Sequence, residues 1–163
     1  MAGGRHELIQ RQFSDGSEQE RALDGWTQRY AQMGPGSYHG EVRRLSLGDV
    51  KVTRETINVA VEQRTSPPAG RSVFVQSLRQ TAAWRVNAEA ITPENSCFLD
   101  GGEEFHAAMP AGCDIIFVEY DDPHKQAEGP GVRPVSAVST GLETYAVASW
   151  LLSLLMAFAE AGG

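Results

Sequence analysis

Residues 33–63 read MGPGSYHGEVRRLSLGDVKVTRETINVAVEQ, and this stretch decides the fold of the chain. The Gly-Pro-Gly run at residues 34–36 is typical of a turn and leads into an extended segment. Residues 47–50 (Leu-Gly-Asp-Val) reverse the chain, and a second extended segment with alternating apolar side chains follows. The stretch therefore predicts a hairpin at the centre of a β-rich domain.

The apolar residues of the second strand change parity along its length. Val50 and Val52 share one face, because successive side chains of a strand point to opposite sides. Ile57, Val59 and Val61 have the opposite parity. We therefore expect the core-facing register to slip by one residue at residues 54–56 (Arg-Glu-Thr), as a β-bulge or a bend at a barrel corner would produce.

The composition fits a single all-β domain. The 163 residues are enough to bury a core, and the 17 Gly and 8 Pro stand mostly between short apolar runs. The net charge of −7 makes the chain poorly suited to bind nucleic-acid phosphates by itself. No basic segment followed by an apolar one opens the chain, so no secretory signal is predicted and the cytoplasm is the expected location.

Further short strands are predicted after the hairpin, at residues 72–78, 83–86, 97–99, 105–109 and 115–120. Strands separated by turns in this way indicate a sandwich or barrel. A short helix is expected within residues 17–30. The predicted organisation is a flexible N-terminal segment at 1–20, a β-barrel at 21–120, a loop at 121–138 and a helix at 139–160.

The predicted terminal helix is apolar nearly all round. Residues 140–143 (Thr-Gly-Leu-Glu) fit a capping box, and residues 142–158 follow as the apolar run. At ~17 residues the run is marginal for a membrane span and lacks a basic flank, so no membrane partner is predicted. A helix that is apolar on every side needs two partners. We expect its own barrel and a second copy of the chain, with burial wholly within the monomer as the alternative. The expected dimer contacts are Leu151, Leu154, Leu155 and Phe158.

Common catalytic and metal-binding motifs are missing. The sequence contains no P-loop, no GxGxxG, no GxSxG and no CxxC pair, and its four histidines are scattered. Residues 103–106 (Glu-Glu-Phe-His) come nearest to the metal-binding pattern of cupin barrels. Cys97 and Cys113 lie in apolar segments and are expected to be buried thiols, with a redox or metal pair as the alternative. No catalytic residue, metal or cofactor is predicted.

Polar or aromatic residues on predicted strands are candidates for a small-molecule pocket in the barrel. They are Arg54, Asn58, Trp84, Glu103 and His106. Each also has a structural interpretation. The arginine can pair with a neighbouring acid, the asparagine can bond a bent backbone, and the tryptophan can fill the core. The glutamate can lie on a turn, and the histidine can be buried with a satisfied ring.

The central stretch resembles the N-terminal domain of AraC-type transcription regulators. The resemblance lies in MGPGSYHGE (33–41), LSLGDVKVTRE (45–55) and NVAV (58–61), and continues more loosely through 68–70, 99–103 and 109–114. It implies a cupin-like jelly-roll barrel that senses a small molecule and dimerises through a helix after the barrel. It also implies a C-terminal DNA-binding half, for which no helix-turn-helix pattern is seen after Phe158.

Three functions are left open. The leading hypothesis is the effector-sensing and dimerisation domain of an AraC-type regulator, a non-enzyme that meets promoter DNA only through a DNA-binding domain absent from this chain. The first alternative is a cupin-type enzyme that acts on a small polar metabolite, with Glu103 and His106 as acid/base groups or metal ligands. The second is a dimerisation module with a filled barrel. A pocket combining Arg with Trp would favour a carboxylate effector with an apolar body.

Overall fold

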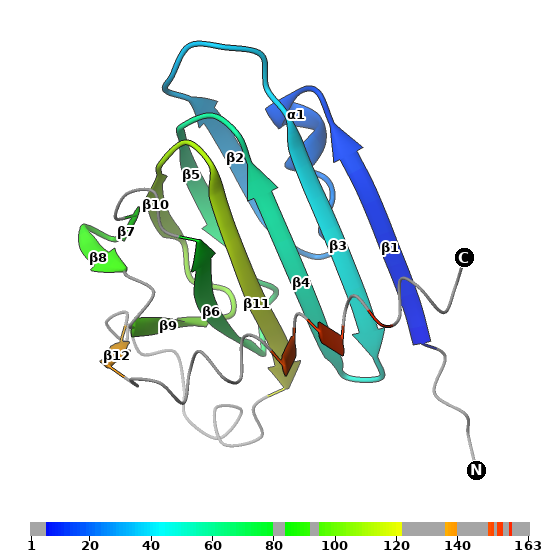
Figure 1. The fold of residues 1–163 in the computed structure, drawn as a ribbon. Coiled ribbons are helices and arrows are strands. Elements are labelled where there is room, and N and C mark those ends of the chain that lie inside the picture. The colour runs from blue at the N-terminus through cyan, green and yellow to red at the C-terminus, as the bar shows by residue number, and fades with distance from the viewer. Residues whose placement is uncertain are drawn as a thin grey trace.

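The structure is a computed structural model that describes residues 6–79, 84–91, 95–121, 136–139, 150–151, 153–154 and 157. Its strands form two antiparallel sheets (Figure 1). The larger sheet has the order β1-β3-β4-β11-β6-β9-β12. These strands are β1 (His6–Phe13), β3 (Gly40–Leu47), β4 (Val50–Ile57), β11 (Cys113–Asp121), β6 (Arg71–Arg79), β9 (Asn95–Asp100) and β12 (Ser136–Ser139).

The smaller sheet has the order β2-β5-β10-β7-β8. Its strands are β2 (Thr27–Gln32), β5 (Val61–Ser66), β10 (Phe105–Met109), β7 (Trp84–Val86) and β8 (Glu89–Ile91). The mainly β fold predicted from the sequence is thereby confirmed. The segments predicted as strands after the hairpin correspond to β6, β7, β9, β10 and β11.

The predicted hairpin is present as β3 and β4, joined by the turn at Gly48 and Asp49. The register slip expected at residues 54–56 is wrong. β4 pairs without interruption with β3 and with β11, and Val52 and Ile57 lie on opposite faces of a regular strand. The parity changes because both faces of this sheet are covered by apolar side chains, so neither face has to be polar.

The main core lies between the two sheets and is formed by the inward side chains of both. Val42, Ile57, Val73, Val75 and Phe117 belong to the larger sheet, and β5, β7 and β10 supply the facing layer. In β10 the pattern is strictly alternating, with Phe105, Ala107 and Met109 buried and the residues between them exposed. Period-two burial of this kind is what a sheet with one solvated face produces.

A second apolar cluster covers the outer face of the larger sheet. Leu45, Val52 and Ile116 from β3, β4 and β11 are buried together with Leu151, and Leu154 packs against them. In Figure 1 the described helical residues of the C-terminal region, drawn in red, lie across these strands. Trp150, Leu151, Ser153, Leu154 and Ala157 are helical. The remainder of the predicted helix, with its capping box at 140–143 and with Leu155 and Phe158, lies outside the described residues.

The N-terminal region differs from the prediction. Residues 6–20 hold β1, which pairs with β3 along its whole length, and α1 (Gly16–Gln19), instead of a flexible segment. The helix expected within residues 17–30 is limited to α1, because β2 begins at Thr27. Asp15 caps α1 through a 2.7 Å hydrogen bond from Ser17 N to its Oδ1. The segment at residues 6–13 is mostly polar and lacks regular alternation of apolar and polar residues, so the sequence pattern did not indicate a strand there.

The predicted loop at 121–138 also differs where the structure describes it. β11 extends to Asp121, and β12 occupies Ser136–Ser139, while residues 122–135 lie outside the described part. Within the described residues, no helix is long and apolar enough to cross a membrane.

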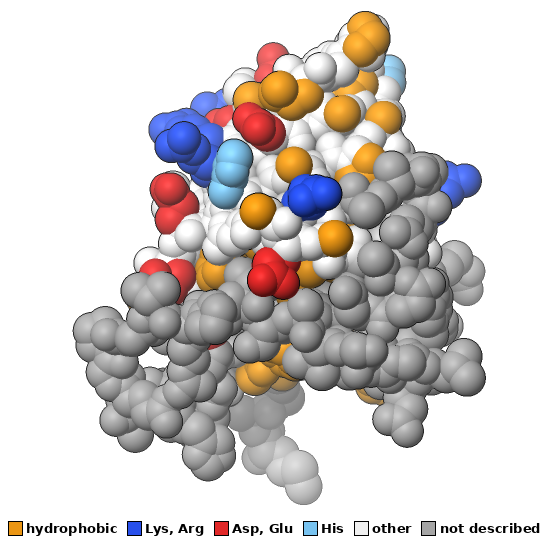
Figure 2. Space-filling model, turned by 90° about the vertical axis from the view of Figure 1, so that its left-hand side faces the viewer, with side chains coloured by type: hydrophobic (Ala, Val, Ile, Leu, Met, Phe, Trp, Pro, Cys, Tyr) orange, Lys and Arg blue, Asp and Glu red, His pale blue; other side chains and the backbone are white. Residues whose placement is uncertain are grey.

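The face that carries β7, β8 and β10 is turned toward the viewer in Figure 2. Hydrophobic side chains of the described residues stand there among polar ones. The large hydrophobic side chains exposed in the described part are Met33, Val50 and Trp150. Isolated exposed hydrophobic residues are ordinary on a protein surface, so this face alone indicates no docking site.

Candidate functional site

A cavity of about 40 Å³ lies between the two sheets. The lining residues that carry a polar group or an indole ring are Trp26, Gln28, Glu55, Gln63, Thr65 and Trp84. Aliphatic and aromatic side chains, Phe105 and Phe117 among them, form the rest. A mostly apolar cavity with a few convergent polar groups is the usual form of a small-molecule site.

Strand alternation explains why these polar groups point inward. Val61, Gln63 and Thr65 are the buried positions of β5, and Thr53, Glu55 and Ile57 are the inward positions of β4. A regular strand that buries Ile57 against the core must turn Glu55 to the same side. The sequence thus inserts a carboxyl group into an otherwise apolar layer.

Glu55 is almost fully buried, with 2% of its surface exposed. Its Oε1 accepts a 2.6 Å hydrogen bond from Tyr30 Oη and a 2.7 Å hydrogen bond from Gln19 Nε2. Gln19 Oε1 in turn accepts from Tyr38 Oη at 2.8 Å, and Gln28 Nε2 donates to Tyr30 Oη at 3.2 Å. This chain of hydrogen bonds connects α1 and β2 with the cavity wall.

Burial raises the pKa of Glu55, and the hydrogen bonds from Tyr30 and Gln19 only partly oppose this effect. Burial also raises the pKa of Tyr30, and the negative charge of Glu55 adds to that rise. Among the described residues no Lys, Arg or His forms an ion pair with Glu55. The environment therefore disfavours the charged form of Glu55 relative to that of a solvent-exposed glutamate.

Three buried polar atoms in the cavity lining have no hydrogen-bond partner among the described residues. They are Gln28 Oε1, Thr65 Oγ1 and Trp84 Nε1. Their side chains belong to residues that are 5%, 6% and 4% exposed, respectively. An unpaired buried polar group costs about 1–3 kcal/mol, so such groups in one cavity indicate a water or ligand that satisfies them.

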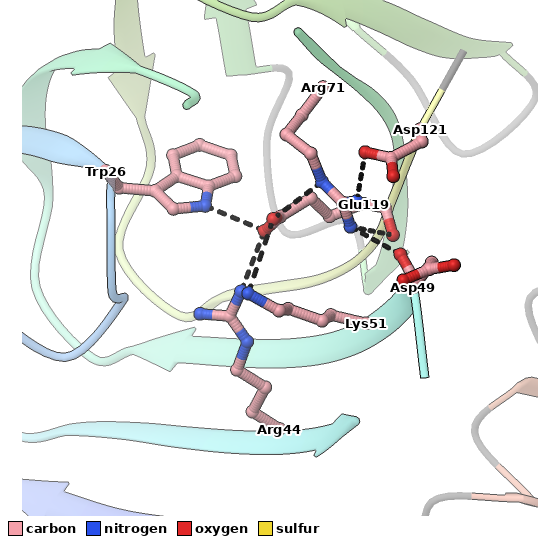
Figure 3. A network of polar contacts seen from close by, with 7 residues as sticks. All are labelled: Trp26, Arg44, Asp49, Lys51, Arg71, Glu119 and Asp121. Atoms are coloured by element: carbon pink, nitrogen blue, oxygen red, sulfur yellow. Dashed lines mark hydrogen bonds and ion pairs between the residues drawn. The ribbon is translucent and has the colours of Figure 1, made fainter. Parts of the chain in front are cut away.

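A second buried carboxylate, Glu119 on β11, is fully compensated. Figure 3 shows Trp26, Arg44, Lys51 and Arg71 converging on it. Arg44 Nη2 lies 2.7 Å from its Oε2, Arg71 Nε 3.1 Å from its Oε1, and Lys51 Nζ 3.7 Å from its Oε1. Trp26 Nε1 donates to Oε2 at 2.9 Å.

Arg71 extends this network to the end of the sheet. It donates to the carbonyl oxygen of Asp49 in the β3–β4 turn at 2.5 Å, and it pairs with Asp121. Trp26 packs on Phe117 with ring centroids 5.3 Å apart, and both residues line the cavity. The network therefore fixes one wall of the cavity to the β3–β4 hairpin.

The five residues predicted to bind a ligand are not brought together. Trp84 lines the cavity, whereas Arg54, Asn58, Glu103 and His106 are not among the lining residues. Arg54 has the outward parity of β4 and forms a two-pronged ion pair with Asp114, at 2.9 Å from Nε and 2.7 Å from Nη2. This ion pair raises the pKa of the Arg54 guanidinium.

Asn58 fixes the turn that leads into the hairpin. Its Oδ1 accepts from His39 N at 2.6 Å, and its Nδ2 donates to Ser37 O at 2.8 Å. Arg54 and Asn58 line a separate groove of about 510 Å³ that also includes Asp114. His106 is exposed on β10, and Glu103 is half-buried in the turn before that strand.

Several functional candidates were missed by reasoning from the sequence, namely Trp26, Gln28, Glu55, Gln63 and Thr65. Glu55 could have been identified from its position two residues before Ile57, because side chains two apart on a regular strand face the same side. The expected bulge removed this relationship. Gln63 and Thr65 carry the same signal relative to Val61. Trp26 and Gln28 lay in a segment expected to be helical.

The cysteines agree with the prediction of buried thiols. Cys97 and Cys113 are free and buried, and burial raises the pKa of Cys97 to about 12. Within the described residues, no cluster of three or more His, Cys, Asp or Glu side chains could hold a metal ion. Glu103 and His106 are therefore not joined there by a third such ligand.

Comparison with known proteins supports the β fold. No protein-family model matches the chain. The fold is similar to the crystal structure of the AraC-like transcriptional activator CuxR, with a TM-score of 0.52 and 12% sequence identity. The match covers 71% of this chain and 47% of that chain, so it spans about half the length of the activator. The chain thus shares the coarse fold of part of an AraC-like activator.

Proposed function

We propose that this chain is the effector-sensing and dimerisation part of an AraC-type transcription regulator. It would be a cytoplasmic, non-catalytic protein with a cupin-like jelly-roll barrel. The observation that carries the proposal is the fold it shares with an AraC-like activator over 71% of its length. DNA contact would belong to a DNA-binding half outside this sequence.

The cavity supports the sensing part of the proposal. It combines aromatic walls with three unpartnered polar atoms and one buried carboxyl group. A ligand that hydrogen bonds to these groups removes the cost of leaving them unpaired. If the two sheets can adopt more than one relative arrangement, binding shifts the population toward the arrangement that binds the ligand best.

Dimerisation is proposed through the C-terminal helix. Leu151 is 7% exposed and packs on the chain's own sheet, as Leu154 does in part, so these two residues hold the helix in place. Trp150, Ser153 and Ala157 are exposed and lie at i, i+3 and i+7, on the other side of the helix. We infer that this side, and not the side of Leu151 and Leu154, meets a second copy of the chain.

A thermal-shift screen against a metabolite panel tests the sensing part. A ligand that binds the folded state raises the melting temperature as its concentration exceeds Kd. We expect one organic metabolite to do so, with a smaller shift in Trp84→Phe, which keeps the aromatic ring but removes the unpartnered N–H. Met33→Leu is the control, because Met33 is 62% exposed and lies outside the cavity.

The outcomes separate the alternatives. A metabolite shift that is equal in the wild type and in Trp84→Phe would place the ligand elsewhere and contradict the proposed site. Stoichiometric iron, manganese or zinc in the purified protein, with turnover of a small metabolite, would favour a cupin-type enzyme. A stable dimer with no response across the panel would leave a dimerisation module.

A further inference from the structure

Glu55 and Glu119 are buried carboxyl groups on the inner face of the same sheet, and among the described residues only Glu119 is paired with cations. Glu119 is surrounded by Arg44, Arg71 and Lys51. Within the described part of the chain, Glu55 receives hydrogen bonds from the neutral groups of Tyr30 and Gln19 only. A glutamate is rarely fully buried without a paired charge. Glu55 therefore lacks the partner that such a position normally has.

The missing partner fits the cavity. We propose that the cavity binds a small organic amine as the effector, with its ammonium group against Glu55, Gln28 Oε1 and Thr65 Oγ1. This proposal rests on the proposed sensing function and names the chemical class of the ligand. An ammonium group has three N–H donors and no acceptor. The lining offers the Glu55 carboxylate and two unpartnered oxygen atoms, which are three acceptor groups.

The aromatic walls favour the same class of ligand. The indole and phenyl rings of Trp26, Trp84, Phe105 and Phe117 line the cavity, and aromatic faces attract cations. Among the described lining residues there is no Lys, Arg or His, so they offer no charge partner to an acid. A carboxylate effector, which the pairing of Arg with Trp suggested, is therefore disfavoured because Arg54 points to the other face of β4 and is bound to Asp114.

The size of the cavity and the remaining donor restrict the class further. About 40 Å³ exceeds the roughly 10–15 Å³ of cavity volume that a single water needs, so the cavity suits a ligand of a few heavy atoms and not a large metabolite. Trp84 Nε1 is an unpartnered donor and needs an acceptor such as a hydroxyl. A short amino alcohol provides both an ammonium and a hydroxyl group, whereas a diol lacks the charge.

The test uses three probes of similar size that differ at one end. Ethanolamine is the cation, ethylene glycol is the neutral analogue and glycolate is the acid, each at equal ionic strength and at a pH where the amine is protonated. We expect ethanolamine alone to raise the melting temperature, by roughly 3–6 °C at about ten times its Kd. Glu55→Gln should weaken its binding about tenfold or more, because a charged hydrogen bond is lost.

Matched variants keep the test decisive. Glu62→Gln removes a carboxylate from the outward side of β5 and should leave the ethanolamine shift unchanged. If Glu55→Gln does not fold, Thr65→Val serves instead, since it removes one acceptor at nearly constant volume, and it should also weaken ethanolamine binding.

Each result has a distinct meaning. A shift with glycolate or ethylene glycol but not with ethanolamine overturns the amine class and leaves the sensing function intact. No shift with any of the three probes also overturns the amine class, and then the metabolite panel with Trp84→Phe decides whether sensing itself fails. An ethanolamine shift that persists in Glu55→Gln places the amine away from Glu55 and contradicts the proposal.

Discussion

Trp26 Nε1 donates a 2.9 Å hydrogen bond to Glu119 Oε2, which joins the wall of the cavity to a buried ion-pair network. The indole ring lines the cavity, while Arg71 continues from Glu119 to the carbonyl oxygen of Asp49 in the β3–β4 turn. A ligand that contacts Trp26 therefore contacts a side chain that is connected to the β3–β4 hairpin through Glu119 and Arg71. This gives a physical route from the cavity to the end of the larger sheet.

Replacing Trp26 by Phe should destabilise the protein by about 1–3 kcal/mol, because a hydrogen bond to a buried carboxylate is removed while most of the ring is retained. Urea unfolding monitored by far-UV circular dichroism measures the change. Met33→Leu, at a side chain that is 62% exposed, should stay within about 0.5 kcal/mol of the wild type. Equal stability of the two variants would show that Glu119 does not need the indole.

Gly40 leaves room for the Gln19 side chain that supports Glu55. A Cβ at position 40 would lie 1.7 Å from Gln19 Oε1, so Gly40→Ala must displace this buried amide. We expect a loss of about 1–3 kcal/mol from overpacking and from lost hydrogen bonds to Glu55 and Tyr38. Gly34→Ala is the control, since its new Cβ would meet Ala60 at 3.7 Å, an ordinary contact.

A double-mutant cycle checks the cause of the Gly40 effect. If the clash with Gln19 is responsible, Gly40→Ala should cost much less in a Gln19→Ala background than in the wild type. Equal costs in both backgrounds would assign the effect to another contact, of which Tyr38 Cε1 at 3.1 Å is the next nearest.

Stability should depend on pH through Glu55. Its pKa is raised by burial in the folded state, so the folded protein holds this proton more tightly than the unfolded chain does. The contribution is complete below the ordinary pKa of 4.5 and is lost as the pH rises through the folded value. The free energy of unfolding of the wild type should therefore fall relative to that of Glu55→Gln as the pH rises from 4 toward 8.

Unfolding of both proteins across this pH range measures the difference and cancels titrations that they share, such as that of Asp15, whose pKa is lowered by its cap to Ser17. A difference that is constant with pH would show that Glu55 has the same proton affinity in the folded and unfolded chain. A protonated amine bound at Glu55 should reduce the pH dependence, because it stabilises the carboxylate.

The sequence predicted the fold where a single side of a strand decides burial. The β3–β4 hairpin was predicted from its turns and alternating apolar residues, and β10 from the turns on either side of it, and the structure buries Phe105, Ala107 and Met109 of β10. The pattern misled where two layers cover one sheet, because Val52 faces the terminal helix and Ile57 faces the main core. Local periodicity cannot distinguish a bulge from a strand with two buried faces.

The same limit explains why the residues that line the cavity differ from those predicted from the sequence. Assuming a slip at residues 54–56 placed Arg54 inward, whereas the regular strand places Glu55 there. Trp84, which lines the cavity, was predicted as an aromatic residue on a strand that faces the barrel interior. The contacts of Glu55 come from Gln19 and Tyr30, which are 36 and 25 residues away, and no local signal predicts such long-range partners.

Arg54 and Glu55 should consequently respond differently to substitution. Arg54→Gln breaks the ion pair with Asp114 at a partly exposed site and should cost about 1 kcal/mol. It should leave the affinity for a cavity ligand unchanged, whereas Glu55→Gln should lower the affinity for an amine ligand. Isothermal titration with the same ligand compares the two variants. Loss of binding in Arg54→Gln would instead favour the separate groove around Arg54 and Asn58 as the ligand site.

Substitutions on the two sides of the terminal helix should affect different properties, with one side changing the stability of the fold and the other the affinity of the dimer. Leu151 is 7% exposed and packs with Leu45, Val52 and Ile116, so Leu151→Ala removes buried volume and should cost about 2–5 kcal/mol. Trp150→Ala removes a side chain that is 63% exposed in the monomer and should leave the stability of the isolated monomer nearly unchanged. If a second copy covers this side, Trp150→Ala should weaken the dimer at least tenfold, because interface tryptophans are common hot spots. Sedimentation equilibrium over a range of concentrations measures the dimer, and an unchanged dimer constant in Trp150→Ala would assign association to another surface.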